Sequence, residues 1–231
     1  MIERGANWEM HLADCESVTA CATWDALVTD PPYGVNLGAE DSQRESAGAY
    51  RSHDDSYESF CASVVPRINA AIVRSKRAAV FSGPHIHEQK KPDAIGGIYC
   101  PAACSRHVWG FKTLLPILLY GAKPHRGSYS IVLHSTESVD RDEVDGHPVP
   151  KPIGWMLWLV GFASADGEVI YDPFAGTATT GVATLRVGGG RRFIGVEKDP
   201  EYFKICVDRL RAEESNSTLA AVRNGQASLF K

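Results

Sequence analysis

The sequence has little of what marks a membrane, secreted or disordered protein. It contains no apolar run of about 18 residues, and its best apolar stretch, residues 153–162, is short and holds two glycines. The N-terminus lacks the basic region and following apolar segment of a signal peptide. An apolar fraction of 44% and a charged fraction of 23% lie near globular averages, which excludes a wholly disordered or collagen-like chain. We therefore expect a soluble, cytoplasmic protein.

Cysteine is too sparse for a disulfide scaffold. The six cysteines are spread over 231 residues, whereas secreted domains held by disulfides are shorter and denser in cysteine. Cys100 and Cys104 are four positions apart, but no second pair with zinc-like spacing follows them. The pattern therefore predicts buried free thiols and no metal site.

Excess charge of one sign is also missing. The net charge of −4 argues against a protein that coats nucleic acid in general. The charges are unevenly spread, however, because residues 40–60 are acidic and residues 90–126 are basic with Asp93 as their one acid. A polyanion is expected to dock on the basic segment. Its cations are Lys90, Lys91, Arg106, Lys112, Lys123 and Arg126.

Apolar runs and turn signals predict an α/β fold with a mostly parallel sheet, because strands alternate with helices along the chain. The length favours one compact domain over residues 1–231. Residues 36–56 and 84–105 lack periodicity and are predicted to be irregular, substrate-facing segments, and the tail 215–231 is expected to be loosely held. The predicted strands are 10–13, 24–29, 77–81, 129–134, 168–171 and 192–197, and the predicted helices are 57–75 with a kink at Pro66, 153–162, 179–187 and 201–213.

The first chemical motif, Asp30-Pro31-Pro32-Tyr33, directly follows the predicted strand 24–29. An acid at the carboxyl end of a parallel strand points into the crevice where α/β proteins bind ligands. The prolines fix φ and remove backbone donors, so a carboxylate and a carbonyl can accept both N–H bonds of an exocyclic amino group. The tyrosine ring offers a face on which a base can stack. The alternative is an ordinary turn that ends a strand.

The second motif, residues 172–181, connects the predicted strand 168–171 to the predicted helix 179–187. Its small residues let a ligand approach the backbone, and the helix N-terminus favours anionic groups. Glu197 ends the next strand, 21 residues after Gly176, a spacing typical of an acid that binds ribose hydroxyls. Because the turn lacks the full dinucleotide fingerprint, the motif favours an adenosine-type cofactor over NAD.

Together the two motifs resemble those of the amino-group DNA methyltransferases of the circularly permuted β class, in which the catalytic motif precedes the cofactor motif. Three further segments resemble that family in order. Residues 13–15 are similar to the segment that contacts the cofactor adenine, residues 147–152 to the entry of the helix before the cofactor loop, and residues 194–202 to the segment with the ribose-binding acid. The resemblance covers residues 8–211 and is weakest over 36–126.

This resemblance implies a Rossmann-like methyltransferase fold, with a mostly parallel central sheet flanked by helices. It also implies methyl transfer from S-adenosyl-L-methionine to N6 of adenine in double-stranded DNA of a prokaryote or phage. Variable DNA-facing segments are expected at 36–56 and 84–126, with Lys112, Lys123 and Arg126 as DNA-binding residues. The implied catalytic residues are Asp30, Pro31, Pro32 and Tyr33, and the implied cofactor-binding residues are Asp14, Cys15, Lys151, Asp172, Phe174, Gly176, Thr177, Thr179 and Glu197.

Several alternatives stay open at this point. In the resembled family an Asp-first motif goes mainly with adenine and a Ser-first motif mainly with N4 of cytosine, so Asp30 favours adenine over a cytosine-N4 enzyme. A C5-cytosine enzyme is disfavoured because no cysteine follows a proline in this chain, and RNA or protein methyltransferases usually keep the cofactor motif first. A catalytically impaired DNA-binding homologue rests on Ala178, where the family usually has Gly. The recognition sequence, a homodimer and a separate restriction endonuclease partner are left undecided.

Overall fold

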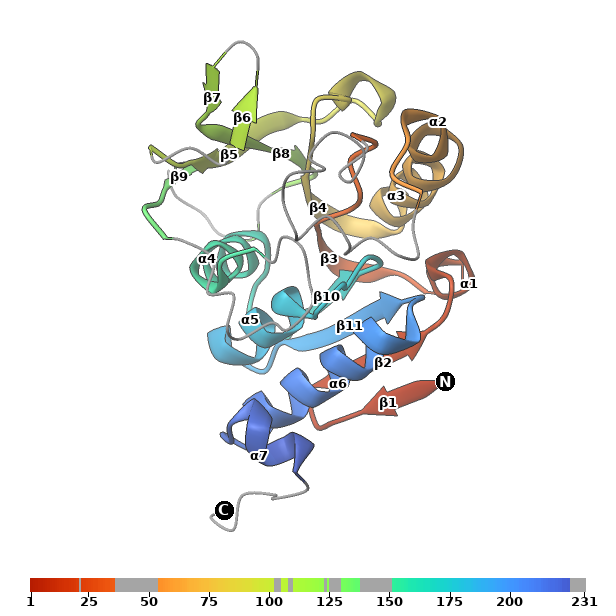
Figure 1. Ribbon diagram of the computed structural model, residues 1–231, viewed down its shortest axis with the longest axis vertical. Coiled ribbons are helices and arrows are strands. Elements are labelled where there is room, and N and C mark those ends of the chain that lie inside the picture. The colour runs from red at the N-terminus through yellow and green to blue at the C-terminus, as the bar shows by residue number, and fades with distance from the viewer. Residues whose placement is uncertain are drawn as a thin grey trace.

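The computed structural model describes residues 1–20, 22–35, 54–101, 105–107, 110–122, 124, 130–137 and 151–224. Within these ranges the chain forms a large mixed sheet covered by helices on both faces (Figure 1). The strand order is β1-β2-β11-β10-β3-β4-β8-β5-β9. The strands are β1 (Ile2–Arg4), β2 (Trp8–Leu12), β3 (Trp24–Thr29), β4 (Ser75–Phe81), β5 (Ala94–Tyr99), β8 (Leu114–Tyr120), β9 (Val132–His134), β10 (Val169–Asp172) and β11 (Arg192–Glu197).

The centre of the sheet is parallel, as the sequence predicts. β2, β11, β10, β3 and β4 pair in parallel, whereas β1 and β8 pair antiparallel with their neighbours. All six predicted strands are found, with bounds shifted by up to a few residues. A separate hairpin joins β6 (Ser105–His107) to β7 (Gly110–Lys112), and it lies beside β5 and β8 at the top of Figure 1.

Both faces of the central strands are buried, which explains why these strands are apolar along their whole length. On β4, Ala78 and Val80 pack in one core cluster with α3, and Ala79 and Phe81 pack in another with α4. A third cluster holds α6 against β2 and β11. The helices are α1 (Cys15–Thr19), α2 (Tyr57–Ser59), the π-helix η1 (Phe60–Val64), α3 (Val65–Val73), the 3₁₀-helix η2 (Ile86–Glu88), α4 (Ile153–Ala163), α5 (Thr179–Val187), α6 (Pro200–Glu214) and α7 (Leu219–Arg223).

Helix α6 follows the pattern predicted for it. Asp199 is its N-cap and accepts bonds from the backbone N–H of Glu201 at 2.8 Å and of Tyr202 at 3.3 Å. Pro200 occupies the first turn, where its missing N–H costs nothing. The predicted helix 57–75 is found as a continuous helical run over 57–73, made of α2, η1 and α3, and Pro66 lies in the first turn of α3, directly after the π turn.

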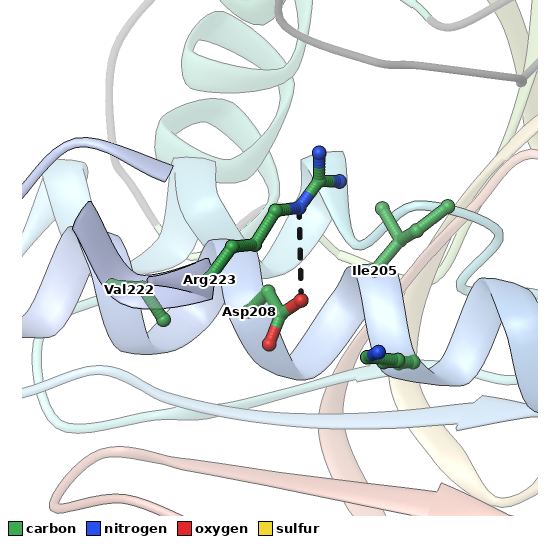
Figure 2. A pocket seen from close by; sticks show the side chains of 5 residues that line it. Ile205, Asp208, Val222 and Arg223 are labelled. Carbon is green, nitrogen blue, oxygen red and sulfur yellow. Dashed lines mark ion pairs between the residues drawn. The ribbon is translucent and has the colours of Figure 1, made fainter. Parts of the chain in front are cut away.

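The expectation that residues 84–105 are irregular is wrong, and two further elements, β8 and α7, are not predicted. β5 lies inside the stretch 84–105, and β8 forms where no element is predicted. Two glycines in β5 and Pro116 in β8 have low strand propensity, so these strands are not predicted from the sequence. Gly97 is nevertheless needed, because a Cβ there would lie 2.6 Å from the carbonyl oxygen of Leu115. The tail contains α7, which packs on α6 with Arg223 Nε 3.8 Å from Asp208 Oδ2 beside a pocket (Figure 2).

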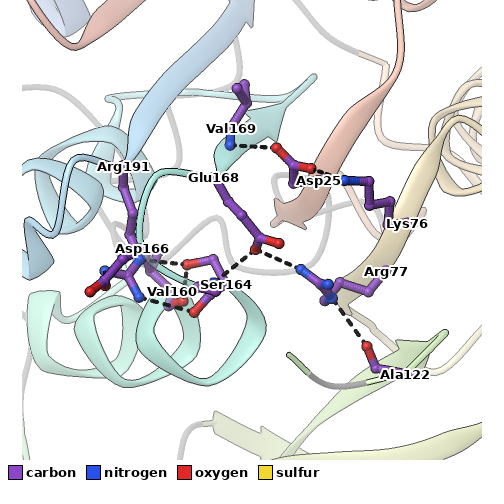
Figure 3. A network of polar contacts seen from close by, with 11 residues as sticks. Asp25, Lys76, Arg77, Ala122, Val160, Ser164, Asp166, Glu168, Val169 and Arg191 are labelled. Atoms are coloured by element: carbon purple, nitrogen blue, oxygen red, sulfur yellow. Dashed lines mark hydrogen bonds and ion pairs between the residues drawn. The ribbon is translucent and has the colours of Figure 1, made fainter. Parts of the chain in front are cut away.

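Polar contacts, some of them buried, join the amino ends of the central strands (Figure 3). The Arg191 guanidinium donates to the hydroxyl of Ser164 at 2.8 Å and to its carbonyl at 3.0 Å. Arg77 of β4 pairs with Glu168 at 2.6 Å, just before β10. These contacts hold the amino ends of the strands together, whereas parallel α/β sheets bind their ligands at the opposite, carboxyl edge. Within the described ranges no helix combines the length and the apolar character needed to cross a bilayer.

Candidate active site at the carboxyl edge of the sheet

The fold brings the acids predicted from the two motifs to one edge. β10 is in register with β3 through Tyr171 and Leu27, and with β11 through Asp172 and Gly195. Because parallel strands end on the same side, Asp30 after β3, Asp172 at the end of β10 and Glu197 at the end of β11 meet there. The backbone N–H of Ala13 donates to the carbonyl of Glu197 at 3.1 Å, which adds the loop containing Asp14.

Asp30 is held by two side chains of its own chain. One carboxylate oxygen accepts a hydrogen bond from the Tyr33 hydroxyl, and the other lies 2.5 Å from Lys151 Nζ. The Lys151 ammonium also lies 5.5 Å from the centroid of the Tyr33 ring and 5.5 Å from that of Phe81. Lys151 is implied by the resemblance to bind the cofactor, but the structure places its ammonium on Asp30.

Tyr33 is positioned by a close backbone approach. An ideal Cβ on Gly83, in the loop after β4, would lie 2.8 Å from the Tyr33 Cβ, so any larger residue there would push the ring away. Pro31 is buried, whereas Pro32 and Tyr33 are half-buried. The tetrapeptide therefore keeps a partly open aromatic ring next to an ionisable carboxylate, which is the arrangement that its proposed base-binding role needs.

Asp172 is the buried anchor of the loop between β10 and α5. Its carboxylate accepts hydrogen bonds from the hydroxyls of Thr29 and Thr180, each at 2.6 Å, and from the backbone N–H of Phe174 at 3.1 Å. Burial raises the pKa of Asp172 to about 6, against the opposing effect of these hydrogen bonds. These contacts join β3, the start of α5 and Phe174, so Asp172 shapes the loop that is expected to hold the cofactor.

Glu197 closes the same loop from the neighbouring strand. One of its oxygens accepts the N–H of Gly176 at 3.0 Å, and the other accepts the N–H of Asp199 at 2.9 Å. Burial raises the pKa of Glu197 above its usual value, while these backbone hydrogen bonds oppose the rise. Because each carboxylate oxygen has a second lone pair, Glu197 keeps the capacity to accept ribose hydroxyls.

Ala178, which stands where the resembled family usually has glycine, adopts a backbone conformation typical of glycine. It is the N-cap of α5, is fully buried, and adopts the left-handed conformation with φ 58° and ψ 34°. Glycine reaches this region without steric cost, whereas for an L-residue with a Cβ the cost is roughly 1–2 kcal/mol. The alanine therefore keeps the backbone shape of a glycine turn, with some loss of stability.

Comparison with known proteins identifies the family. Residues 90–208, just over half of the chain, match the family model described as DNA methylase, N6_N4_Mtase. The chain belongs to this DNA methylase family. Among its relatives, the DNA adenine methyltransferase YhdJ of Escherichia coli (strain K12) is 39% identical over 69 residues, which are 30% of this chain and 23% of YhdJ. The chain spans about a quarter of the length of the curated relatives that it matches.

Solved structures confirm the fold of this chain. The M1.HpyAVI–SAM complex superposes with a TM-score of 0.62 at 17% identity, covering 88% of this chain and 98% of that one. The cytosine-N4-specific PvuII DNA methyltransferase gives a TM-score of 0.62 at 14% identity, covering 95% of this chain and 94% of that one. The expected α/β methyltransferase fold is thereby confirmed.

One buried residue of the site, Arg209, is not predicted from the sequence. Arg209, on α6, has 8% of its surface exposed, and its Nη1 donates to the carbonyl of Thr177 at 2.6 Å. The same nitrogen lies 3.2 Å from the Thr177 hydroxyl and 3.1 Å from the Thr179 hydroxyl. Helical periodicity assigns Arg209 to the polar, outward face of α6, and no local signal shows that the loop between β10 and α5 covers it. Cys206, on the same helix, donates its thiol to the carbonyl of Gly176 at 3.1 Å.

The remaining cofactor candidates lie at the start of α1. Asp14 is its N-cap and is paired with Arg67 of α3, whose Nη2 lies 3.0 Å from the carboxylate. This hydrogen-bonded ion pair lowers the pKa of Asp14. The neighbouring Cys15 is buried, which raises the pKa of its thiol to about 12. Asp14 is half-exposed and keeps its charge, whereas Cys15 is a neutral packing residue next to it.

The structure describes only part of the expected DNA-facing side. Lys112 is exposed at the end of β7, immediately before β8. Since Phe81 pairs with Ile117 in the antiparallel β4–β8 ladder, the start of β8 projects beyond the carboxyl end of β4, on the same side as Asp30. Lys123, Arg126, residues 36–53 and residues 147–150 lie outside the described residues.

Proposed function

We propose that this DNA methylase transfers the methyl group of S-adenosyl-L-methionine to the N6 amino group of adenine in double-stranded DNA. The observation that carries the proposal is the meeting of Asp30 and Tyr33 with the loop 172–178 and Glu197 at one edge of the sheet. The name of its relative YhdJ, a DNA adenine methyltransferase, supports adenine as the target. The order of the motifs supports assignment to the circularly permuted β class.

The residues around the loop 172–178 fit the proposed cofactor. When bound, S-adenosyl-L-methionine supplies an electrophilic methyl group on a sulfonium. Glu197 would hold its ribose hydroxyls, Phe174 would pack against its apolar surface, and Asp14 would face the adenine amino group. The positive N-terminus of α5, with the buried Arg209 beneath Thr177 and Thr179, suits the methionine carboxylate. Asp172 and Gly176 would shape this loop.

Asp30 and the carbonyl of Pro31 would position the target nitrogen. By accepting its two N–H bonds they favour a pyramidal nitrogen whose lone pair points at the methyl carbon. The new N–C bond would form as the methyl–sulfur bond breaks, which leaves a neutral thioether, and the nitrogen would then give one proton to the Asp30 carboxylate. This is catalysis by orientation and electrostatic preorganisation. The base must first leave the duplex stack at a cost of a few kcal/mol, which stacking on Tyr33 would partly offset. The Lys151 ammonium, 2.5 Å from one carboxylate oxygen, would help to orient Asp30.

DNA would approach along the side that carries Lys112. Its exposed ammonium lies beyond the carboxyl end of β4, where a phosphate beside a flipped base would pass. Lys123 and Arg126 belong to the same basic stretch of sequence and are proposed as further phosphate contacts. The methylase would then bind DNA through a local basic patch, in spite of its net charge of −4.

The direct test is to incubate the purified protein with tritiated S-adenosyl-L-methionine and genomic DNA from a methylation-deficient bacterium. Digestion of the DNA to nucleosides then identifies the product. We expect N6-methyladenine, and no product from an Asp30→Ala variant that still binds S-adenosylhomocysteine. Exclusive formation of N4-methylcytosine would overturn the choice of adenine. Cofactor and DNA binding without any methylated product would support the impaired DNA-binding homologue instead.

A further inference from the structure

The residue after the catalytic tetrapeptide is held by side chains from elsewhere in the fold. The backbone N–H of Gly34 donates to Asp55 Oδ1 at 2.8 Å, and its carbonyl lies 3.2 Å from Nε2 of His85. Asp55 has 8% of its surface exposed. Both polar groups of this peptide residue are therefore bound by side chains, one from the segment before α2 and one from the loop after β4.

The space around Gly34 is equally restricted. Gly34 has φ +69°, and an ideal Cβ on it would lie 2.6 Å from the Cβ of Phe60. Phe60 is 2% exposed and is the first residue of the π-helix η1. Single π turns inside helices often occur at functional sites, and here the π turn begins at the side chain that packs on the catalytic turn.

His85 is itself supported by aromatic neighbours. Its ring lies 4.8 Å from that of Tyr57 and 5.8 Å from that of Phe60, centroid to centroid. The Tyr57 hydroxyl donates to Glu88 at 2.8 Å, which ties α2 to η2. The groups that hold Gly34 thus belong to a packed unit, and they can fix the position of the turn that precedes it.

We infer that Asp55 and His85 are positioning residues that hold the turn Asp30-Pro31-Pro32-Tyr33 in its reactive pose through the two polar groups of Gly34. The inference rests on the proposed function, because it is the transfer step that makes the pose of this turn matter. Misplacing a reacting group by about 1 Å can cost on the order of 10²-fold in rate. The cofactor loop makes none of its described contacts with Asp55 or His85, so cofactor binding is expected to be unaffected.

The test compares the variants Asp55→Ala and Asp55→Asn with the wild type in the methylation assay. The asparagine oxygen can still accept the Gly34 N–H, whereas alanine removes the acceptor. We expect kcat to fall about 10- to 100-fold in Asp55→Ala, with recovery to within about threefold of wild type in Asp55→Asn. The KM for S-adenosyl-L-methionine and the Kd of S-adenosylhomocysteine should stay within about twofold. Glu58→Ala, which removes a nearby exposed acid, is the matched control and should leave kcat unchanged.

His85 gives a second, independent arm. His85→Gln keeps a side-chain N–H that can donate to the Gly34 carbonyl, whereas His85→Phe keeps only a ring. We therefore expect kcat to fall in the His85→Phe variant and to stay close to the wild-type value in the His85→Gln variant. If Asp55→Ala does not fold, this pair decides. Full activity in Asp55→Ala or in both His85 variants, or a loss that the conservative variants do not restore, would overturn the inference. An inactive wild type would refute the proposed function and this inference with it, whereas an active wild type beside fully active alanine variants refutes this inference alone.

Discussion

The substitution Glu197→Ala tests the assignment of the cofactor site most sharply. The carboxylate binds the N–H groups of Gly176 and Asp199 at 3.0 and 2.9 Å, and it is proposed to bind the ribose. Loss of a charge-assisted hydrogen bond to the ligand costs about 1.5–3 kcal/mol. That range corresponds to a rise in the Kd of S-adenosylhomocysteine of roughly 10- to 150-fold.

The same substitution has a smaller effect on folding. Two backbone N–H groups lose their acceptor, and burial already disfavours the ionised carboxylate of Glu197 by raising its pKa. We therefore expect a loss in the free energy of unfolding of about 1–2 kcal/mol. The stability measurement gives the folded fraction of each variant under the conditions of the binding measurement, so that a change in Kd can be assigned to the site.

Isothermal titration calorimetry measures the Kd, and urea denaturation measures the stability. Glu201→Ala, which removes an exposed acid from the first turn of α6, is the matched control and should bind S-adenosylhomocysteine like the wild type. Glu197→Gln should fall between wild type and alanine, because its amide oxygen can accept one of the two N–H groups and its NH₂ group faces the other. An unchanged Kd in Glu197→Ala together with a lower turnover at saturating cofactor would refute the ribose role.

Three further outcomes are expected. Asp30→Ala should abolish methylation while the Kd of S-adenosylhomocysteine changes less than tenfold, and a larger change would show that Asp30 contacts the cofactor. Since the pKa of Asp172 is raised to about 6, the folded state binds more protons than the unfolded state between about pH 4 and 6. As the pH rises from 4 to 6, the free energy of unfolding measured in urea should therefore fall by about 3 kcal/mol relative to that of Asp172→Asn. A difference between the two proteins that does not change with pH would contradict this. Reversing Lys112, Lys123 and Arg126 to Glu should flatten the slope of log K for DNA against log salt by about 0.9 for each phosphate that the variant no longer binds, whereas an unchanged slope would place the DNA elsewhere.

Local sequence patterns are enough to locate the strands and helices that carry the two motifs. β3, β10, α5 and β11 are predicted nearly at their observed bounds, because apolar runs and turn residues act over only a few positions. The edge at which the acids meet also follows from sequence, since parallel strands end on one side. β5 and β8 are missed because their glycines and proline have local costs that the neighbouring strands offset only once the sheet has formed.

Only the tertiary structure decides which side chains surround the catalytic turn. Lys151 reaches Asp30 from 121 positions along the chain, Asp55 and His85 bind Gly34, and Arg209 lies under the loop before α5. Periodicity shows which face of an element is apolar, but it does not show which element covers that face. The local sequence around Lys151 or Arg209 would be the same if the side chain faced water. The packing of distant segments determines that Lys151 meets a carboxylate and Arg209 a backbone carbonyl.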